Sequence, residues 1–389
     1  MNSLQNQILF NYENAKYRFV LISVTNRCNN ACDYCYLGCN NNIGKNTISL
    51  DTVKKIINEY CLYLQDFPIE ERFLTIIWHG GEPLIVRKEF YEKVLSLQKE
   101  YNEKFGVKFI NGIETNGTLL TKEWADFLRN NNFHIGLSID GPEFVHDIHR
   151  RDKNHNSSFS KTLRGIEILE KEKIPFSVIS VITDKNFQYS KEMLDFFLQF
   201  KNLRYVDFLP AYDPNGKIEL LSPENYGNFL ASLFDEWIRL GGPSKLYIRY
   251  FEDLILKMTG KITKNTPMGC EIMGRCGEIQ YVDENGDLYP CVTLPIKEEL
   301  SMGNLCNDDF KTCLNSKNYK YFQRKFNELH EDCKACDILS ICKGGCATRR
   351  FYQPNKESYG KDYYCSARKK IISKIKKYCK EVKPNGRRN

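Results

Sequence analysis

The sequence predicts an α/β protein with a parallel sheet, followed by a small cysteine-rich module. From Tyr17 to Pro210, short apolar runs alternate with amphipathic stretches, which is typical of buried parallel strands joined by helices, in an open sheet or a barrel. The 16 cysteines are gathered at the two ends of the chain. Clustered cysteines in a long chain without an export signal indicate metal sites, not a disulfide framework.

Six short runs of β-branched and aromatic residues, bounded by Gly, Asn, Asp or Pro, are the predicted strands. They are Phe19–Val24, Phe73–Trp78, Phe109–Ile113, Ile135–Ile139, Phe176–Ile182 and Tyr205–Leu209. Between them lie helix candidates such as Asp51–Leu64, whose apolar residues recur at helical spacing. Cys61 falls on that apolar stripe, so we expect it to be a buried thiol.

Polar segments whose side chains could bind ligands or take part in catalysis follow the first four predicted strands. The Cys28 cluster follows the first strand, His79-Gly-Gly-Glu-Pro the second, Thr115-Asn-Gly the third and Asp140-Gly-Pro the fourth. Functional residues in parallel α/β folds lie at the carboxyl ends of the strands. We therefore expect these segments to form one site.

The chain after Pro210 changes character. Ser222-Pro223 supplies an N-cap and a first-turn proline for a helix that ends at Gly241-Gly242. A second helix is predicted at Tyr250–Met258, and Lys261–Pro267 is a polar linker. The remaining short segments, turns and cysteines are typical of a module held together by metal.

Composition and charge exclude several classes of protein. The chain has 389 residues, of which 42% are hydrophobic and 27% charged, as in soluble globular proteins. No apolar run reaches the ~18–20 residues of a membrane span, so we expect a cytoplasmic protein without a membrane partner. Lys and Arg exceed Asp and Glu by 56 − 49 = 7. The segment from Arg368 to Arg388 holds much of the basic excess, which we interpret as a solvated helix face and tail and not as a nucleic-acid surface.

The first cysteine cluster is Cys28-x3-Cys32-x2-Cys35, in a polar loop after a strand. Three thiolates on a cluster of four irons leave one iron open, as a catalytic metal site requires. Cys39 could be a fourth ligand that closes the site. Spacing alone leaves a closed structural cluster or a zinc site as alternatives.

This cluster, with Tyr34 before its last cysteine, resembles that of the radical S-adenosylmethionine (radical SAM) enzymes. The resemblance implies that Cys28, Cys32 and Cys35 bind a 4Fe–4S cluster whose fourth iron chelates the cofactor. Cleavage of the cofactor then gives a 5′-deoxyadenosyl radical that abstracts hydrogen from the substrate. The resemblance also implies a set of cofactor contacts, namely Tyr34, Gly80, Gly81, Glu82, Pro83, Thr115, Asn116, Ser138 and Asp140.

The C-terminal field has eight cysteines in a spaced pattern, which suits two four-cysteine sites of zinc or of iron and sulfide. Within it, Gly286-Asp-Leu-Tyr-Pro-Cys291 is predicted to be a hairpin that presents a ligand. The pattern resembles the SPASM extension of radical SAM enzymes, which holds two auxiliary 4Fe–4S clusters. The resemblance implies one ligand set of Cys270, Cys276, Cys291 and Cys346, and a second of Cys333, Cys336, Cys342 and Cys365. Cys306, Cys313 and Cys379 lie outside it.

Together these resemblances imply a partial (β/α)6 TIM-like barrel followed by a small iron–sulfur (SPASM) domain. The expected boundaries are 1–215 for the radical SAM barrel, 216–266 for a helical connection, 267–370 for the SPASM domain and 371–389 for a basic C-terminal tail. The expected cofactors are S-adenosyl-L-methionine and three 4Fe–4S clusters. The expected partners are a peptide or protein substrate and a low-potential electron donor, flavodoxin or ferredoxin.

The chain also resembles the anaerobic sulfatase-maturating enzymes, which oxidise a Cys or Ser of a sulfatase to formylglycine. It departs from them at Val292, where they have an Asp base, at His79, where they have Gln, and at Leu37, where they have Tyr. Because valine cannot take a proton, we expect the same radical chemistry on another peptide, forming a thioether or carbon–carbon crosslink in a ribosomal peptide. Sulfatase maturation is the alternative, and a non-catalytic metal-binding or electron-transfer protein is the distant one.

Histidines and one aspartate complete the candidate site. We predict catalytic roles for His79, as a pocket acid or base, and for Asp140, which could instead cap the following turn. The alternative for His79 is that it orients the neighbouring loop. We expect His146 and His149 at the surface, at the start of a helix.

Overall fold

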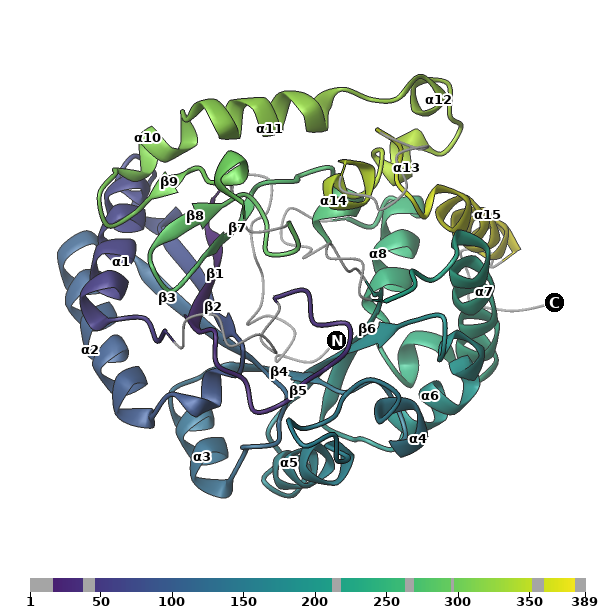
Figure 1. The fold of residues 1–389 in the computed structure, drawn as a ribbon. Helices are drawn as coiled ribbons and strands as arrows, with labels where there is room; N and C mark the ends of the chain where they lie inside the picture. The colour runs from purple at the N-terminus through teal and green to yellow at the C-terminus, as the bar shows by residue number, and fades with distance from the viewer. Residues whose placement is uncertain are drawn as a thin grey trace.

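The computed structural model describes residues 17–37, 46–211, 218–262, 269–294, 297–351 and 360–381. Its central element is one sheet of nine strands in the order β6-β5-β4-β3-β2-β1-β7-β8-β9 (Figure 1). The strands are β1 Phe19–Thr25, β2 Phe73–Gly80, β3 Lys108–Thr115, β4 His134–Ser138, β5 Phe176–Ile182, β6 Leu203–Pro210, β7 Ile279–Val282, β8 Asp287–Tyr289 and β9 Gly303–Asn304.

Strands β1 to β6 pair in parallel, each with the next along the chain. Helices lie on the outer side of this curved sheet (Figure 1). The helices of this half are α1 Leu50–Leu64, α2 Lys88–Phe105, α3 Lys122–Asn130, α4 Glu143–His146, α5 Phe159–Lys171 and α6 Ser190–Phe197. The predicted partial (β/α)6 barrel is therefore confirmed, and all six predicted strands are present.

The hydrophobic core of the barrel lies between the sheet and the surrounding helices. Val20 and Ile22 of β1 are fully buried, as are Ile76 and Trp78 of β2. Cys61 of α1 is also fully buried, as the apolar stripe predicted. Since alternate residues of a strand face opposite sides, residues such as Ser23 and His79 face the interior of the barrel, where the strands expose polar groups.

The cysteine-rich segment extends the same sheet. Strand β7 pairs in parallel with the free edge of β1, with Phe19 opposite Ile279, and then forms an antiparallel hairpin with β8. The hydroxyl of Tyr60 on α1 donates a buried 2.7 Å hydrogen bond to Oε1 of Gln280. Sequence analysis predicted the hairpin but not its union with the barrel, which covers a strand edge that would otherwise be unpaired.

Helices after the barrel cover its β6 side and surround the cysteine-rich segment. They are α7 Pro223–Arg239, α8 Arg249–Met258, α9 Cys270–Met273, α10 Phe310–Leu314, α11 Lys317–Asn327, α12 Glu331–Lys334, α13 Leu339–Cys342, α14 Ala347–Phe351 and α15 Cys365–Glu381. Ser222 caps α7 as predicted, with its side chain accepting from the backbone N–H of Asn225. In the described part of the chain, no helix is long and apolar enough to cross a membrane.

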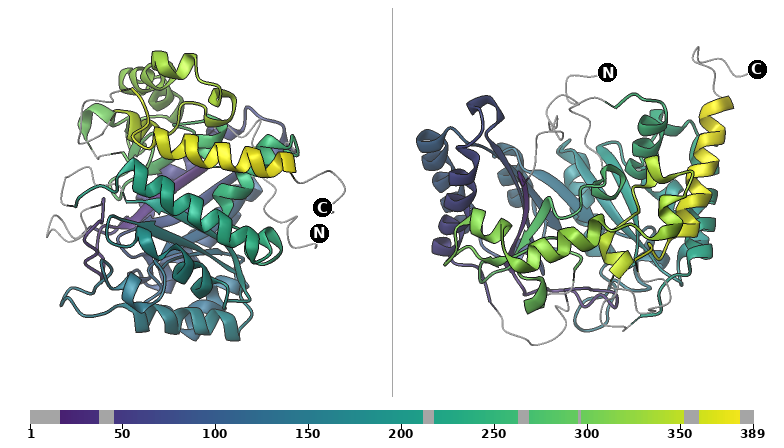
Figure 2. Two further views of the ribbon diagram at one scale, coloured as in Figure 1. Left: turned by 90° about the vertical axis from the view of Figure 1, so that its right-hand side faces the viewer. Right: turned by 90° about the horizontal axis from the view of Figure 1, so that it is seen from above.

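Helix α15 contains the part of the basic C-terminal segment that the structure describes. It lies along α7 (Figure 2) and buries Ile371, Ile372 and Ile375. Its lysines face outward, with Lys374 paired to Asp235 of α7 at 2.7 Å. The predicted solvated basic face is thus one side of a packed helix, and residues 382–389 of the predicted tail lie outside the described residues.

Candidate active site

The loop after β1 brings the first three cysteines together. The thiols of Cys28, Cys32 and Cys35 lie close enough to affect one another electrostatically. Burial is the main cause that raises the pKa of Cys28 and of Cys32 to about 12. Thiols in such surroundings become thiolates when a cationic metal centre supplies positive charge, so the donor set fits an iron–sulfur cluster. Cys39 lies outside the described residues.

The Gly80-Gly81 pair after β2 packs directly against this loop. The N–H of Gly81 donates to Thr25 O at 2.7 Å, and the N–H of Glu82 donates to Arg27 O at 2.8 Å. A Cβ at Gly81 would lie 2.2 Å from Arg27 O, and a Cβ at Gly80 would lie 2.3 Å from Thr25 O. Glycine is therefore required at both positions for this segment to support the backbone just before Cys28.

Glu82 connects the ends of β2 and β3. Its carboxylate accepts from Thr115 Oγ1 at 2.6 Å, from the N–H of Asn116 at 2.8 Å and from the N–H of Leu84 at 3.0 Å. The amide of Asn116 lies 3.9 Å from Cys28 Sγ. Burial raises the pKa of Glu82 to about 7, although these hydrogen bonds act in the opposite direction. Pro83 is buried and opens the 3-10 turn that Glu82 caps.

Asp140, after β4, is fully buried and makes contacts to three other segments. Its Oδ2 accepts from the Tyr34 hydroxyl at 2.5 Å, and its Oδ1 accepts from the N–H of Val181 at 2.9 Å. Oδ1 also pairs with Arg150 Nε at 3.0 Å. These contacts tie the cysteine loop to β4 and β5, so the structure gives Asp140 a supporting position. Its catalytic role stays a prediction.

His79 occupies the inner face of β2, where it pairs in register with Ser23 of β1. Its Nδ1 is buried and has no hydrogen-bond partner among the described residues. Burial lowers the pKa of His79 to about 4, so the imidazole is neutral near pH 7. Ser138 ends β4, on the same rim of the barrel. The chemical roles of both residues stay predictions.

The prediction that His146 and His149 lie at the surface is wrong. Their exposed fractions are 0% and 2%. His146 Nε2 lies 2.9 Å from Ser158 Oγ, and His149 Nε2 lies 3.0 Å from Thr183 Oγ1. They belong to a short helix and turn that fold inward over the cysteine loop. Polar partners offset the cost of burying Nε2 of each ring, whereas Nδ1 of His146 has no hydrogen-bond partner among the described residues.

Sequence analysis missed several charged groups of the barrel interior. Arg150, which pairs with Asp140, is one of them, and the ion pair between Asp207 of β6 and Arg249 of α8 is another. Burial raises the pKa of Glu114 on β3 to about 8. A Cβ on the neighbouring Gly136 would lie 2.0 Å from its carboxylate. These charges are distinguished by their position inside the curved sheet, which only the folded chain shows.

The C-terminal cysteines lie in two groups in the structure. The thiols of Cys270, Cys276, Cys291 and Cys346 interact electrostatically with one another. Cys333, Cys336, Cys342 and Cys365 line one cavity. In the described part of the chain, no three His, Cys, Asp or Glu side chains are placed to hold a single metal ion. An iron–sulfur cluster carries each thiolate on a separate iron, so the two sets fit such a group, and the ligand assignment stays a prediction.

Comparisons with family models agree with this geometry. The Radical SAM superfamily model matches residues 22–197, which contain strands β2 to β5, part of β1 and the first cysteine loop. The model of the SPASM iron–sulfur cluster-binding domain matches residues 274–337, which contain four of the eight predicted ligands. Both predicted resemblances are confirmed.

Known proteins are similar over nearly the whole chain. A serine-type anaerobic sulfatase-maturating enzyme from Bacteroides thetaiotaomicron is 32% identical over 87% of this chain and 84% of its own length. A cysteine-type enzyme from Clostridium perfringens is 32% identical over 89% of this chain and 92% of its own length. The solved structure "Native anSMEcpe with bound AdoMet" has a TM-score of 0.81 and 26% identity, covering 94% of this chain and 100% of that one.

These similarities correct the main functional expectation. The interpretation as a maturase that crosslinks a ribosomal peptide is wrong, because the similar proteins are sulfatase-maturating enzymes. That interpretation rested on single side chains at Val292, His79 and Leu37. Such changes leave the scaffold intact, and the missing acid at Val292 does not exclude another proton acceptor in the barrel. The distant alternative of a non-catalytic protein is wrong too.

The cysteine loop on its glycine support, the two further cysteine sets and the similarity along the whole chain agree with one another. The chain therefore belongs to the anaerobic sulfatase-maturating enzymes, a family of radical SAM oxidoreductases that modify a protein residue.

Proposed function

We propose that this protein oxidises a Cys or Ser side chain of a sulfatase to formylglycine. The observation that carries the proposal is the 32% identity to enzymes of this activity over 87% and 89% of the chain. One of these relatives is a serine-type enzyme and the other a cysteine-type enzyme, at the same identity. The comparison therefore supports the reaction and leaves both side chains as substrates to test.

The proposed cofactors are S-adenosyl-L-methionine and three 4Fe–4S clusters. Cys28, Cys32 and Cys35 would hold the first cluster, and the two C-terminal sets would each hold one. When bound, the first cluster and the cofactor supply a 5′-deoxyadenosyl radical that removes a hydrogen atom from the substrate. The solved structure with bound AdoMet at a TM-score of 0.81 supports the placement of this cofactor at the barrel rim.

The residues of this rim hold the reacting parts in position. Glycine at Gly80 and Gly81 lets the cysteine loop lie on β2, while Glu82 fixes the end of β3 through Thr115 and Asn116. Tyr34, Ser138 and Asp140 complete the proposed cofactor contacts. Tyr34, Glu82 and Asp140 of this rim are buried.

The oxidation also releases a proton, and we propose that His79 accepts it. Removal of two electrons and two protons converts the side chain of Ser to the aldehyde and that of Cys to a thioaldehyde, which water hydrolyses to the aldehyde with release of hydrogen sulfide. One electron and one proton leave together as the hydrogen atom. Val292 has no proton-accepting atom. His79 is neutral because burial lowers its pKa to about 4, and its Nδ1 has no partner among the described residues. Its position just before Gly80-Gly81 places it at the rim.

The two C-terminal cysteine sets would hold auxiliary clusters that could accept the second electron. With four thiolates each, these clusters have no open iron, so their role is to carry electrons and not to bind substrate. The proposed electron donor for the first cluster is a flavodoxin or ferredoxin. The solved relative "Native anSMEcpe with bound AdoMet and Cp18Cys peptide" supports a peptide or protein as the substrate.

The test is an anaerobic reaction with S-adenosylmethionine, a low-potential reductant and two sulfatase-type peptides. One peptide carries Cys-x-Pro-x-Arg and the other has Ser in place of the Cys. Mass spectrometry follows 5′-deoxyadenosine and both peptides. We expect conversion of at least one peptide to the aldehyde, and about 12 irons per chain after reconstitution.

The control is the triple variant Cys28→Ala, Cys32→Ala and Cys35→Ala. It should lose cofactor cleavage but keep about 8 of the irons, because the two C-terminal sets are intact. Cofactor cleavage in the wild type without aldehyde on either peptide would refute the proposed substrate. Cleavage that persists in the triple variant would refute the assignment of the radical site.

A further inference from the structure

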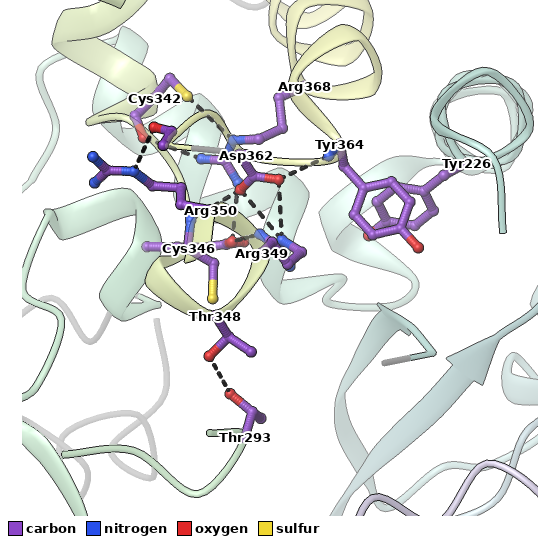
Figure 3. Close-up of polar contacts among 12 residues, drawn as sticks. Tyr226, Thr293, Cys342, Cys346, Thr348, Arg349, Arg350, Asp362, Tyr364 and Arg368 are labelled. Atoms are coloured by element: carbon purple, nitrogen blue, oxygen red, sulfur yellow. Dashed lines mark hydrogen bonds and ion pairs between the residues drawn. The ribbon is translucent and has the colours of Figure 1, made fainter. Parts of the chain in front are cut away.

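Four charged side chains, two of them buried and two partly buried, lie between the two C-terminal cysteine sets. They are Glu271, Arg349, Asp362 and Arg368, and Figure 3 shows the last three with Cys342 and Cys346. Arg368 is 2% exposed and Asp362 is 3% exposed. Two carboxylates and two guanidinium groups cancel one another in charge, as buried ions require.

Contacts among these groups form one connected network. Both Arg349 Nη2 and Arg368 Nη1 contact Glu271 Oε2, the latter at 3.0 Å. Arg349 Nε also lies 3.2 Å from each oxygen of Asp362. The network joins α9, α14 and α15. Helix α9 begins at Cys270 of the first set, and α15 begins at Cys365 of the second set.

The two carboxylates lie against the first set. Glu271 directly follows Cys270, and it acts to raise the pKa of the Cys270 thiol, although burial is the larger cause. Asp362 Oδ2 accepts a 2.9 Å hydrogen bond from the backbone N–H of Cys346. The positive charge of Arg349 acts on the Cys270 thiol in the opposite direction, and a neutral group, Thr293 Oγ1, lies 3.2 Å from Cys291 Sγ.

The guanidinium of Arg368 lies against the second set. Its Nε donates to Cys342 Sγ at 3.2 Å, and its Nη2 donates to Cys342 O at 3.2 Å (Figure 3). The charges of Glu271 and Arg349 therefore oppose each other beside the first set. The second set has Asp362 in the lining of its cavity, but it also has a cation, Arg368, that donates a hydrogen bond directly to a ligand sulfur. Because these charges are close to the cysteines and largely shielded from solvent, their effect on the two sites is only weakly screened.

This polarity has a definite effect on two iron–sulfur clusters. An added electron makes a cluster more negative, so a cation and a hydrogen bond to a ligand sulfur raise its reduction potential. Nearby carboxylates lower the potential for the same reason. The second auxiliary cluster should therefore accept electrons more readily than the first.

We propose that Arg368 is a positioning residue that raises the reduction potential of the second auxiliary cluster above that of the first. An electron then passes from the reduced first cluster to the oxidised second cluster, with no proton or bond change. This inference rests on the cluster assignment of the proposed function and adds the direction of electron flow and the side chain that sets it.

The test is a redox titration of the auxiliary clusters, followed by electron paramagnetic resonance without substrate. The chain carries Cys28→Ala, Cys32→Ala and Cys35→Ala, so that only the auxiliary clusters give signals. We expect two separate reduction waves. Arg368→Gln should shift the higher wave to lower potential and narrow the gap, while the lower wave shifts less. Arg368→Lys retains the charge without the fixed guanidinium geometry, so the higher wave should shift by a smaller amount.

Two controls separate this effect from general disturbance. Lys377→Gln removes a charge from the same helix whose side chain is 80% exposed, and it should leave both waves unchanged. Thr293→Val removes a neutral partner of Cys291 and should affect the lower wave alone. A higher wave that does not move in either Arg368 variant would overturn the proposal. If Arg368→Gln does not bind iron, Arg368→Lys still decides the matter.

The outcomes also separate this proposal from the proposed function. Aldehyde formation with unaltered potentials in the Arg368 variants would refute only the role of Arg368. Conversely, shifted potentials in a chain that modifies neither sulfatase peptide would refute the substrate and leave the role of Arg368 standing. Absence of iron from the second set in the wild type would overturn both the cluster assignment and this inference.

Discussion

The hydroxyl of Tyr34 donates a 2.5 Å hydrogen bond to Oδ2 of Asp140, across 106 residues of chain. Tyr34 lies between two of the three cysteines of the first cluster loop, and Asp140 follows β4. Arg150 pairs with the same carboxylate, and its guanidinium carbon lies 5.3 Å from the centre of the Tyr34 ring. Tyr34 thus connects the cysteine loop to a buried ion pair of the barrel, formed by Asp140 and Arg150.

Asp140→Asn should release this loop. The substitution leaves Arg150 buried without its charged partner, which costs about 3–5 kcal/mol. We expect the variant to lose cofactor cleavage and the iron of the first cluster while keeping the auxiliary clusters. Iron analysis and the 5′-deoxyadenosine yield measure these two losses.

Tyr34→Phe and Asp33→Asn are the matched controls for Asp140. Tyr34→Phe removes one hydrogen bond but no charge, so its effect on stability should be about 1–3 kcal/mol. Asp33 belongs to the same loop, but 55% of its side chain is exposed, and its substitution should have little effect. Full iron content in Asp140→Asn would show that the ion pair does not hold the loop.

Gly81→Ala should displace the cysteine loop by a different route. Its Cβ would lie 2.2 Å from Arg27 O, a backbone atom that cannot rotate away. Overpacking of this kind costs about 1–3 kcal/mol or more, and here the strain falls beside Cys28. We expect a lower yield of 5′-deoxyadenosine per chain. Gly269→Ala, next to Cys270, is the control because its Cβ would meet nothing closer than 3.7 Å.

Local sequence patterns predicted the barrel strands because each strand is a short apolar run with clear boundaries. Strand β5 has the predicted bounds Phe176–Ile182, and β1 differs from its prediction only at one end. The pairing of β7 with β1 was not predictable in the same way, since the two strands are about 250 residues apart and β7 has only four residues. Register between distant short strands depends on tertiary packing.

The candidate site likewise has parts that the sequence predicts and parts that depend on long-range packing. Resemblance to known families implied the cysteine sets, and their assignment as cluster ligands stays a prediction. The resemblance did not identify Arg150 or Arg368, whose partners Asp140 and Glu271 become neighbours only in the folded chain. Buried histidines were misjudged for the same reason: His146 is polar in sequence, and only the folded chain shows Ser158 beside it.

His79→Gln should separate cofactor cleavage from product formation. Glutamine keeps a polar side chain but cannot accept a proton at neutral pH. Loss of a general base lowers the rate by about 10²–10⁴-fold, so we expect 5′-deoxyadenosine to form with little aldehyde. The same substitution at His134, at the opposite end of a strand, should leave the ratio of the two products unchanged.

A double variant tests whether the missing acid at Val292 and the histidine are alternatives. Val292→Asp in the His79→Gln background supplies a carboxylate in the loop after Cys291. If His79 is the proton acceptor, the added carboxylate should restore part of the aldehyde yield. Equal aldehyde yields from the wild type and His79→Gln would show that the proton goes elsewhere.

Acid should destabilise the protein through His146. Burial is the main cause that lowers its pKa from 6.5 to about 3, with Arg150 acting in the same direction and Asp140 against it. Between these two pKa values the unfolded chain binds more protons than the folded chain, so stability falls as the pH falls. The contribution is complete above about pH 6.5 and decreases by about 1.4 kcal/mol for each pH unit below it.

Urea unfolding at a series of pH values from 7 to 5 measures this slope. His146→Gln keeps a polar group for Ser158 but does not titrate, so its stability should fall less steeply with acid than that of the wild type. Both chains share the other buried histidines and the acid sensitivity of bound iron, so the difference between their slopes isolates His146. The exposed His155 is the control, and His155→Asn should retain the wild-type slope. Equal slopes for His146→Gln and the wild type would mean that His146 does not gain a proton on unfolding.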